Sequence, residues 1–126
     1  MRLEAFVVGI CLFAGFVRPA FSGQELSYIQ VRSAILANRI HLIDVREPEE
    51  FSAGHIPGAV NLPLSTFKAD ALPLPSEVPV VLMCRSGRRA VQALAIARTS
   101  GRTDLELYPG GMNEWATEGG PVVLGR

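Results

Sequence analysis

The stretch that decides the fold is Cys84-Arg85-Ser86-Gly87-Arg88-Arg89, a basic loop between two segments of different character. Before it, Pro79-Val80-Val81-Leu82-Met83 is an apolar run of strand length, and after it Ala90 to Thr99 is rich in helix-forming residues. The pattern predicts a buried strand that ends at Cys84 and a helix that begins directly after the loop. In an open parallel sheet, this crevice between strand ends and helix starts is where ligands bind.

The composition of the loop predicts a small anion-binding cup around a reactive thiol. The amino end of a helix presents unpaired backbone N–H groups and the positive end of the helix dipole, and both favour an anion. We therefore expect Cys84 to ionise more readily than a free thiol, and its sulfur to lie where amides and guanidinium groups meet solvent. Ser86 and Gly87 allow a tight turn, since glycine adopts dihedral angles that other residues avoid. The alternative is an inert core residue, because cysteine is often packed as a small hydrophobe.

Helical and strand-like segments alternate along the rest of the chain. We expect helices from about Val31 to Asn38, from Pro48 to Gly54, from Arg88 to Thr99 and from Met112 to Thr117, with a short helix capped by Ser65. We expect strands at 41–45, 59–62, 79–83 and 104–108, the last with one face in water. This alternation predicts an α/β fold with a parallel sheet and helices on both faces. A chain of 126 residues suits one such domain.

The first 22 residues have the pattern of a secretory signal. Arg2 gives a positive start, Ala5 to Val17 is continuously apolar, and Ala20-Phe21-Ser22 carries small residues where a signal peptidase cuts. We therefore expect a cleaved signal peptide over residues 1–22, one domain over 23–126, and an exported, soluble protein of the kind found in a bacterial periplasm. An uncleaved membrane anchor is the competing interpretation, but the run is shorter than the ~20 apolar residues of a spanning helix.

Export would leave Cys84 as the one thiol, because Cys11 departs with the signal, and no internal disulfide is then available. The full chain has 12 basic and 12 acidic residues, and loss of residues 1–22 leaves 10 and 11. This balance gives no overall attraction to nucleic acid or to a membrane surface. We find no metal-ligand spacing and expect neither a metal nor a cofactor.

Several separated motifs resemble those of the single-domain rhodaneses, proteins similar to thiosulfate sulfurtransferase. In chain order they are Leu42-Ile43-Asp44-Val45-Arg46-Glu47 with Glu50-Phe51, then Gly54-His55-Ile56-Pro57-Gly58-Ala59-Val60-Asn61, the Cys84 loop, Tyr108-Pro109-Gly110-Gly111 with Trp115, and Gly120-Pro121. The resemblance spans residues 26 to 123.

The resemblance implies a small α/β domain with a central parallel sheet, and a sulfur transfer in two halves. Cys84 would take the outer sulfur of thiosulfate or a similar small anionic donor, become a persulfide, and pass the sulfur to cyanide or a thiol. The family's loop folds around that sulfur, so Arg85, Ser86, Gly87, Arg88 and Arg89 would form the cradle. Arg89 would contact the oxyanion of the donor.

Other polar residues in these motifs are open to a structural interpretation. Arg85 and Arg88 either steer anions or are solvated surface charges. We expect structural polar contacts, rather than catalytic ones, from Asp44, Arg46 and Glu50. We expect His55 to fix a turn and Trp115 to lie in the core or in a lid.

Two other function classes compete with sulfur transfer. Cysteine phosphatases and arsenate reductases hold oxyanions in similar loops, but usually with five residues between Cys and Arg, whereas four separate Cys84 from Arg89. Some rhodanese-like domains are non-catalytic binding modules. The sequence leaves the physiological donor and acceptor open.

Overall fold

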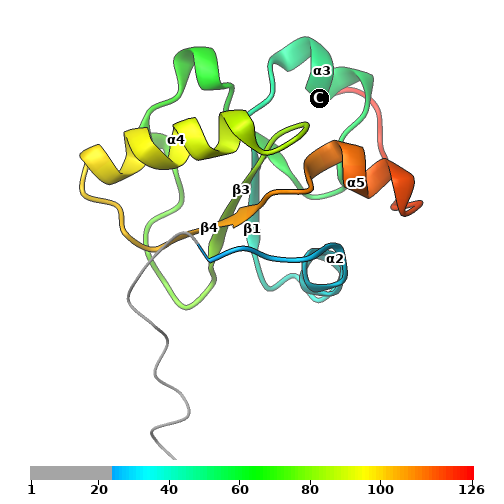
Figure 1. Cartoon of the computed structure of the whole chain (residues 1–126), viewed down its shortest axis with the longest axis horizontal. Coiled ribbons are helices and arrows are strands. Elements are labelled where there is room, and N and C mark those ends of the chain that lie inside the picture. Colours follow the sequence, from blue (N-terminus) through cyan, green and yellow to red (C-terminus); the bar gives the residue numbers. More distant parts are fainter. Residues whose placement is uncertain (1–23) are drawn as a thin grey trace, which may run out of the picture.

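The central sheet is parallel throughout, as predicted, and its strand order is β2-β1-β3-β4 (Figure 1). The strands are β1 (His41–Asp44), β2 (Val60–Asn61), β3 (Val80–Met83) and β4 (Leu105–Tyr108). This computed structural model describes residues 24–126. The predicted signal peptide and Cys11 lie outside the described residues.

The register of the strands brings three chain segments to one edge of the sheet. Asp44, the last residue of β1, pairs with Met83 of β3, and Met83 pairs with Tyr108, the last residue of β4. The segments that follow these three residues therefore leave the sheet side by side. Cys84 is the first residue of one of them.

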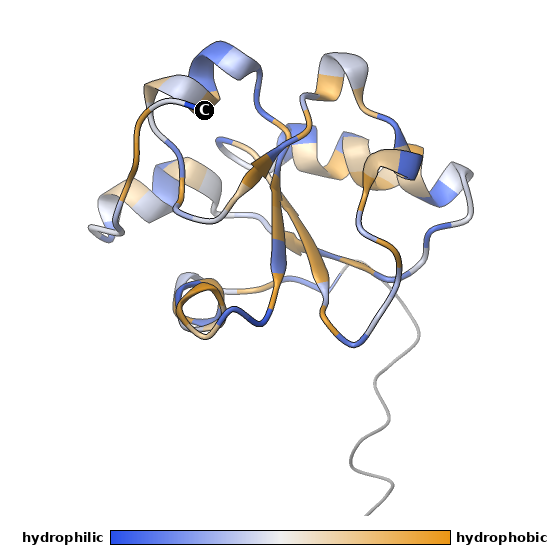
Figure 2. Cartoon of the chain, turned by 180° about the vertical axis from the view of Figure 1, so that it is seen from behind, coloured by the Kyte–Doolittle hydropathy of each residue, from blue (hydrophilic) through white to orange (hydrophobic). Residues whose placement is uncertain are grey.

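Helices cover both faces of the sheet, and an apolar cluster lies beneath each layer (Figures 1 and 2). The helix α4 (Arg88–Thr99) packs on one face through Ala90, Ala93, Leu94 and Ala97. The helices α2 (Tyr28–Leu36) and α5 (Gly111–Thr117) pack on the other through Tyr28, Val31 and Trp115. The short helix α3 (Pro48–Ala53) follows β1. The predicted α/β architecture is confirmed.

Local sequence signals account for most helix ends. Ser27 and Gln30 form a reciprocal capping box at the start of α2, which satisfies two backbone N–H groups. Asn38, the residue after the C-cap of that helix, has a φ of 57°, as its tolerance of the left-handed region predicts. Pro48 opens α3 and α4 spans the predicted residues. No helix within residues 24–126 is both long and apolar enough to cross a membrane.

Two local predictions are wrong. Ser65 does not cap a helix: residues 64–71 form two 3₁₀ turns, η2 (Leu64–Thr66) and η3 (Ala69–Ala71), and the Ser65 hydroxyl donates to Glu47 Oε1 at 2.6 Å. The strand β4 has no wet face, since all four of its residues are buried and Glu106 is 6% exposed. Helices cover both faces of this strand, and residues 24–26 pair along its outer edge with Leu107.

Candidate active site

Cys84 lies at the carboxyl edge of the sheet, between the end of β3 and the start of α4. Its Sγ accepts a hydrogen bond from the backbone N–H of Gly87 at 3.1 Å. Gly87 has a φ of 99°, in the left-handed region that favours glycine, and it directly precedes Arg88, the first residue of α4. The tight turn places the sulfur at the amino end of a helix, as the loop sequence predicts.

The first turn of α5 holds the loop from the opposite side. The N–H of Met112 donates to the Cys84 carbonyl at 2.9 Å, and the N–H of Asn113 donates to the Arg85 carbonyl at 3.0 Å. Because a trans peptide places its N–H opposite its C=O, the N–H groups of residues 85 and 86 point away from α5. Within residues 24–126, the N–H groups of residues 85, 86, 88 and 89 have no backbone acceptor. The loop therefore has four further N–H groups without a backbone acceptor among the described residues, beside the Gly87 N–H that points at the sulfur.

The thiol is more deeply buried than the sequence predicts. Cys84 is 1% exposed and belongs to the apolar cluster that includes Ala90 and Ala93 of α4, so the expectation that its sulfur meets solvent is wrong. The physical reason is its place at the end of a central strand, under a helix that starts four residues later. Arg85 and Ser86 above it are exposed. A reactant must therefore reach the sulfur through the rim of the loop.

Arg89, the predicted contact for a donor oxyanion, is paired with a carboxylate of this chain. Its Nη1 and Nη2 donate to Glu50 Oε1 and Oε2 at 2.6 and 3.0 Å. The hydrogen bond from Arg89 lowers the pKa of Glu50 to about 2, and the same hydrogen bond raises the pKa of Arg89. Contact of Arg89 with a donor stays a prediction, and any such contact would share the guanidinium with Glu50.

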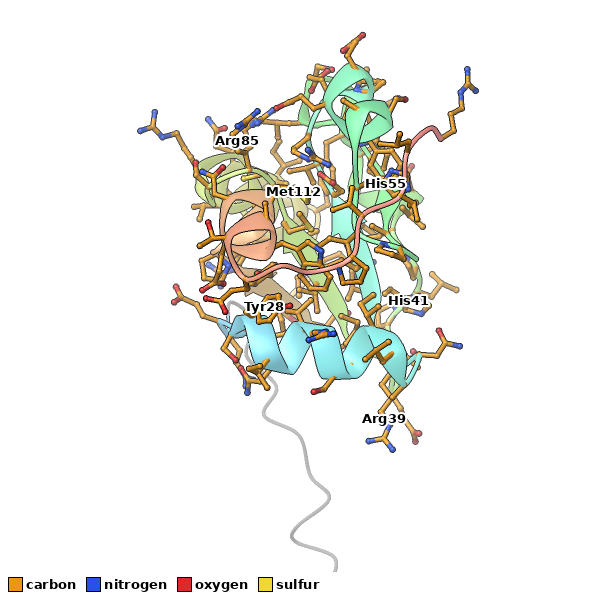
Figure 3. All side chains as sticks on the ribbon, turned by 90° about the vertical axis from the view of Figure 1, so that its right-hand side faces the viewer. Tyr28, Arg39, His41, His55, Arg85 and Met112 are labelled. Atoms are coloured by element: carbon orange, nitrogen blue, oxygen red, sulfur yellow. The ribbon has the colours of Figure 1, made fainter. Side chains whose placement is uncertain are left out.

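The other two loop arginines face outward. The Arg85 side chain is 61% exposed, with Nε 3.9 Å from Glu50 Oε2, and Figure 3 shows it at the same end of the molecule as Met112. Arg88 is exposed and has no ion-pair partner among the described residues. Both remain available to attract an anion to the loop.

Asp44 and Arg46 form a buried structural pair, as predicted. Arg46 donates to both carboxylate oxygens of Asp44, with its Nη2 2.7 Å from Oδ2, and the same Nη2 donates to the Gly54 carbonyl at 2.8 Å. The side chains are 5% and 0% exposed. Asn61 donates to the carbonyls of both residues at 2.9 and 2.8 Å. These bonds tie the turn after β1 to α3 and to the edge strand β2.

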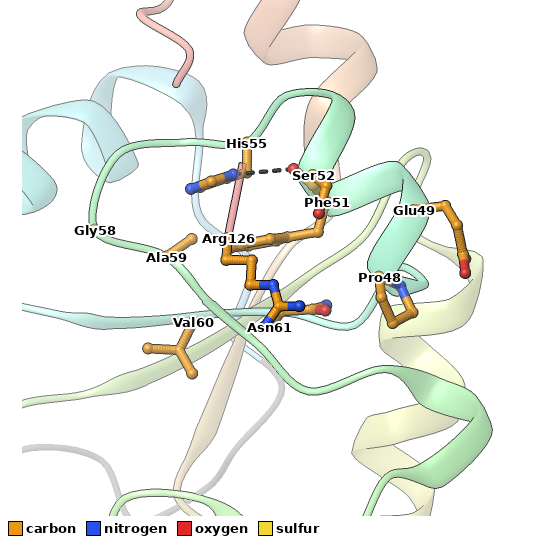
Figure 4. A pocket seen from close by; sticks show the side chains of 10 residues that line it. All are labelled: Pro48, Glu49, Phe51, Ser52, His55, Gly58, Ala59, Val60, Asn61 and Arg126. Carbon is orange, nitrogen blue, oxygen red and sulfur yellow. Dashed lines mark hydrogen bonds between the residues drawn. The ribbon is translucent and has the colours of Figure 1, made fainter. Parts of the chain in front are cut away.

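His55 and Trp115 also hold structure. The His55 ring stacks on Phe51 with centroids 3.7 Å apart, and its Nδ1 lies 2.9 Å from the Phe51 carbonyl (Figure 4). The cavity of about 930 Å³ beside these residues lies along β2 and is not lined by the Cys84 loop. Trp115 is 1% exposed, and its Nε1 donates to the Pro121 carbonyl at 2.8 Å. It is therefore a core residue.

A cleft of about 560 Å³ lies against the loop, and its lining was not predicted from the sequence. Its charged lining residues are Arg46, Glu49, Glu50 and Arg85, and Met112, Ala116 and Val122 contribute apolar walls. In residues 24–126, no three His, Cys, Asp or Glu side chains gather closely enough to hold a metal ion.

Two proteins named as sulfurtransferases are similar to this chain in sequence. The thiosulfate:glutathione sulfurtransferase of Homo sapiens is 35% identical over 104 residues, covering 71% of this chain and 90% of the human protein. The protein of the same name from Saccharomyces cerevisiae is 35% identical over 92 residues, covering 63% of this chain and 66% of the yeast protein.

A solved structure and a family model extend the comparison. The structure of the human single-domain sulfurtransferase TSTD1 superimposes with a TM-score of 0.64 at 33% identity, covering 76% of this chain and 97% of the human chain. The model of the rhodanese-like domain matches residues 28–118, which include both layers of helices and the whole Cys84 loop. The chain therefore belongs to the rhodanese-like domain family.

Proposed function

We propose that this protein is an exported sulfurtransferase that carries a sulfane sulfur on Cys84, from thiosulfate or a similar anion to a thiol or cyanide. One observation carries the proposal: the Gly87 N–H points at the Cys84 sulfur, at the amino end of α4, inside a rhodanese-like domain. The free loop amides and the relatives named sulfurtransferase support it.

The first half-reaction loads the cysteine. The Cys84 thiolate attacks the outer sulfur of thiosulfate, a new S–S bond forms, and the S–S bond of thiosulfate breaks. Sulfite leaves with the bonding electron pair, so no external oxidant or reductant is needed. The attacking thiolate, the departing sulfite and the persulfide product are all anionic, and the N–H groups of residues 85–89 are donors for such charge. Arg85 and Arg88 attract the anionic donor to the rim.

The second half-reaction removes the outer sulfur from Cys84. An acceptor thiolate attacks the outer sulfur of the persulfide, the Cys84 S–S bond breaks, and Cys84 leaves as a thiolate while the acceptor becomes a persulfide. Splitting one transfer into two displacements is ordinary covalent catalysis. We propose a small thiol as the acceptor, with glutathione as the first compound to test, because two relatives are named for that acceptor.

Export is part of the proposal and rests on sequence alone. The apolar stretch of residues 5–17, followed by Ala20-Phe21-Ser22, would direct the chain to the periplasm and be removed. Expression of the full chain in a bacterium, followed by fractionation and intact-mass measurement, tests this. We expect a periplasmic product that begins near Gly23. A cytoplasmic or membrane-bound product of full length would contradict it.

The sulfur-transfer step is tested on the purified domain. Thiosulfate should add the mass of one sulfur atom to the wild type and none to Cys84→Ser, and cyanide should then restore the original mass and release thiocyanate. Absence of both the added sulfur and the thiocyanate in the wild type would remove the proposal.

The burial of Cys84 favours one other function, a non-catalytic binding module in which the thiol is only a packing residue. The two functions differ in what the thiol does. If Cys84→Ala leaves the physiological phenotype intact while Cys84 never accepts sulfur, the binding module is correct.

A further inference from the structure

Residues 121–125 form a strap that crosses back over the end of α3. The backbones of His55 and Val123 exchange two hydrogen bonds, each 2.9 Å long, and the Gly125 N–H donates to the Ser52 carbonyl at 2.8 Å. At its start, the strap accepts the indole hydrogen bond of Trp115. The strap is therefore fixed to the domain at both ends, although the family model matches only to residue 118.

These anchors place Val122 in a defined position. A Cβ at Gly54 would lie 3.0 Å from Val122 Cγ1, so the missing side chain of this glycine lets Val122 pack directly on the turn. The Gly54 carbonyl is itself held by buried Arg46 at 2.8 Å. Val122 is thus supported by the same polar contacts that hold the turn after β1.

Val122 faces the cleft beside the Cys84 loop. Met112 and Ala116 of α5 line the same cleft, together with charged side chains of both signs from Arg46, Glu49, Glu50 and Arg85. At about 560 Å³ the cleft is much larger than cyanide or thiosulfate requires. Its apolar walls suit the carbon skeleton of a larger molecule, and the exposed guanidinium of Arg85 suits a carboxylate carried by that molecule.

We infer that the strap is one wall of the acceptor site, and that Val122 determines specificity for a thiol by packing against the carbon atoms of the acceptor. The inference rests on the proposed sulfurtransferase function and adds to it a binding site and a residue. The cleft that Val122 lines includes neither Cys84 nor residues 86–89, so we expect Val122 to act only in the second half-reaction. Cyanide is too small to contact this wall and serves as an internal control.

The experiment compares Val122→Ala with Val123→Ala. The two valines are adjacent and similarly exposed, at 44% and 41%, but Val123 does not line the cleft. Each variant is loaded with thiosulfate and then unloaded with glutathione or with cyanide, and both half-reactions are followed by mass. We expect Val122→Ala to raise the KM for glutathione about three- to tenfold, the size of losing one or two buried methyl contacts. Loading by thiosulfate and unloading by cyanide should stay unchanged, and Val123→Ala should match the wild type.

The possible outcomes separate this inference from the proposed function. If the wild type accepts sulfur from thiosulfate and passes it to glutathione, but Val122→Ala keeps the wild-type KM for glutathione, the assignment of the strap is overturned and the proposed function stands. Equal effects of the two valine variants, or equal losses with glutathione and cyanide, also overturn it, since they indicate a general change of the domain. If the wild type accepts no sulfur, the proposed function fails and the acceptor site fails with it. A second variant, Val122→Phe, should fill the cleft and slow unloading by glutathione but not by cyanide.

Discussion

The guanidinium of Arg89 faces the carboxylate of Glu50 in a two-point ion pair, with N···O distances of 2.6 and 3.0 Å. The pair joins the first turn of α4 to the first turn of α3, across 39 residues of chain. Glu50 also accepts from the Glu47 N–H at 3.0 Å, so one carboxylate caps α3 and holds the end of the cysteine loop. Arg89, a residue of the candidate cradle, therefore orients the loop through its ion pair with Glu50.

Replacement of Glu50 by Gln should weaken that orientation and change the response to acid. The pKa of Glu50 is lowered to about 2, chiefly by the hydrogen bond from Arg89, from an ordinary value of 4.5. A carboxylate whose pKa is lower in the folded state than in the unfolded state stabilises the fold. This contribution is complete above the pKa of the unfolded state, and it is lost as the pH falls towards the pKa of the folded state. At pH 7 the free energy of unfolding of Glu50→Gln should therefore be lower than that of the wild type by about 1 kcal/mol. This difference should disappear as the pH falls from 4.5 to about 2.

Urea denaturation at a series of pH values measures this difference. Glu49→Gln is the control, because Glu49 is exposed on the same helix and has no ion-pair partner among residues 24–126. A parallel pH dependence for Glu50→Gln and the wild type would contradict the assigned role.

The backbone of Gly87 allows the turn at the sulfur, so Gly87→Ala should damage the loop. Its φ is 99°, and a Cβ there would lie 2.9 Å from the Pro109 carbonyl oxygen. We expect a loss of about 1–2 kcal/mol in the free energy of unfolding from the left-handed backbone alone, together with slower sulfur loading because the N–H that faces Cys84 moves. Gly101→Ala is the control, since it has a φ of 91° with nothing within 4 Å. Thermal unfolding should show a similar backbone strain in both variants, whereas only Gly87→Ala should load more slowly, and equal loading rates would refute the prediction.

The close packing of Gly111 on the loop predicts a second effect from the other side. A Cβ at Gly111 would overlap the carbonyl oxygens of Cys84 and Arg85, which accept the first hydrogen bonds from α5. Gly111→Ala should push α5 away from the loop, destabilise the domain by about 1–3 kcal/mol as overpacking does, and slow loading. Gly119→Ala should carry backbone strain, because its φ is 78°, but it should leave α5 in place and the loading rate unchanged, because nothing lies within 4 Å of the added Cβ. Amide hydrogen exchange of Met112 and Asn113 reports the loosening, and unchanged protection would count against it.

The buried pair of Asp44 and Arg46 should dominate the electrostatic stability of the domain. Asp44→Asn leaves a buried guanidinium without its charge partner, which costs about 3–5 kcal/mol in comparable cases. Asp104→Asn is the matched control, because Asp104 pairs with Arg102 through a side chain that is 34% exposed. For that variant we expect at most about 1 kcal/mol. Urea denaturation of both variants is the measurement, and similar losses would show that burial does not set the difference.

The burial of Cys84 predicts size-dependent reactivity. At 1% exposure, the folded protein should react with a bulky aromatic disulfide much more slowly than the urea-unfolded chain does, while thiosulfate still loads the sulfur. Thiol titration in the presence and absence of urea gives the comparison. If neither thiosulfate nor iodoacetamide modifies the folded protein, Cys84 is a packing residue.

The features that the sequence determined by itself are those that depend on neighbouring residues. The start of α4 after Gly87, the opening of α3 at Pro48 and the left-handed Asn38 follow from dihedral preferences that act over one or two residues. The alternation of apolar and helical segments was enough to predict the parallel sheet, and the order of strand end, Cys84 and helix start was enough to place the thiol.

Only the tertiary structure decided which groups meet across the sheet edge. The pairing of Arg89 with Glu50, the burial of Glu106 and Cys84, and the place of Val122 in the cleft each join segments far apart in sequence. Such contacts depend on strand register and helix packing, because alignment of Asp44, Met83 and Tyr108 at one edge is what brings the following segments together. A local pattern contains no information about that alignment, so the place of the thiol between strand end and helix start was predictable and its surroundings were not.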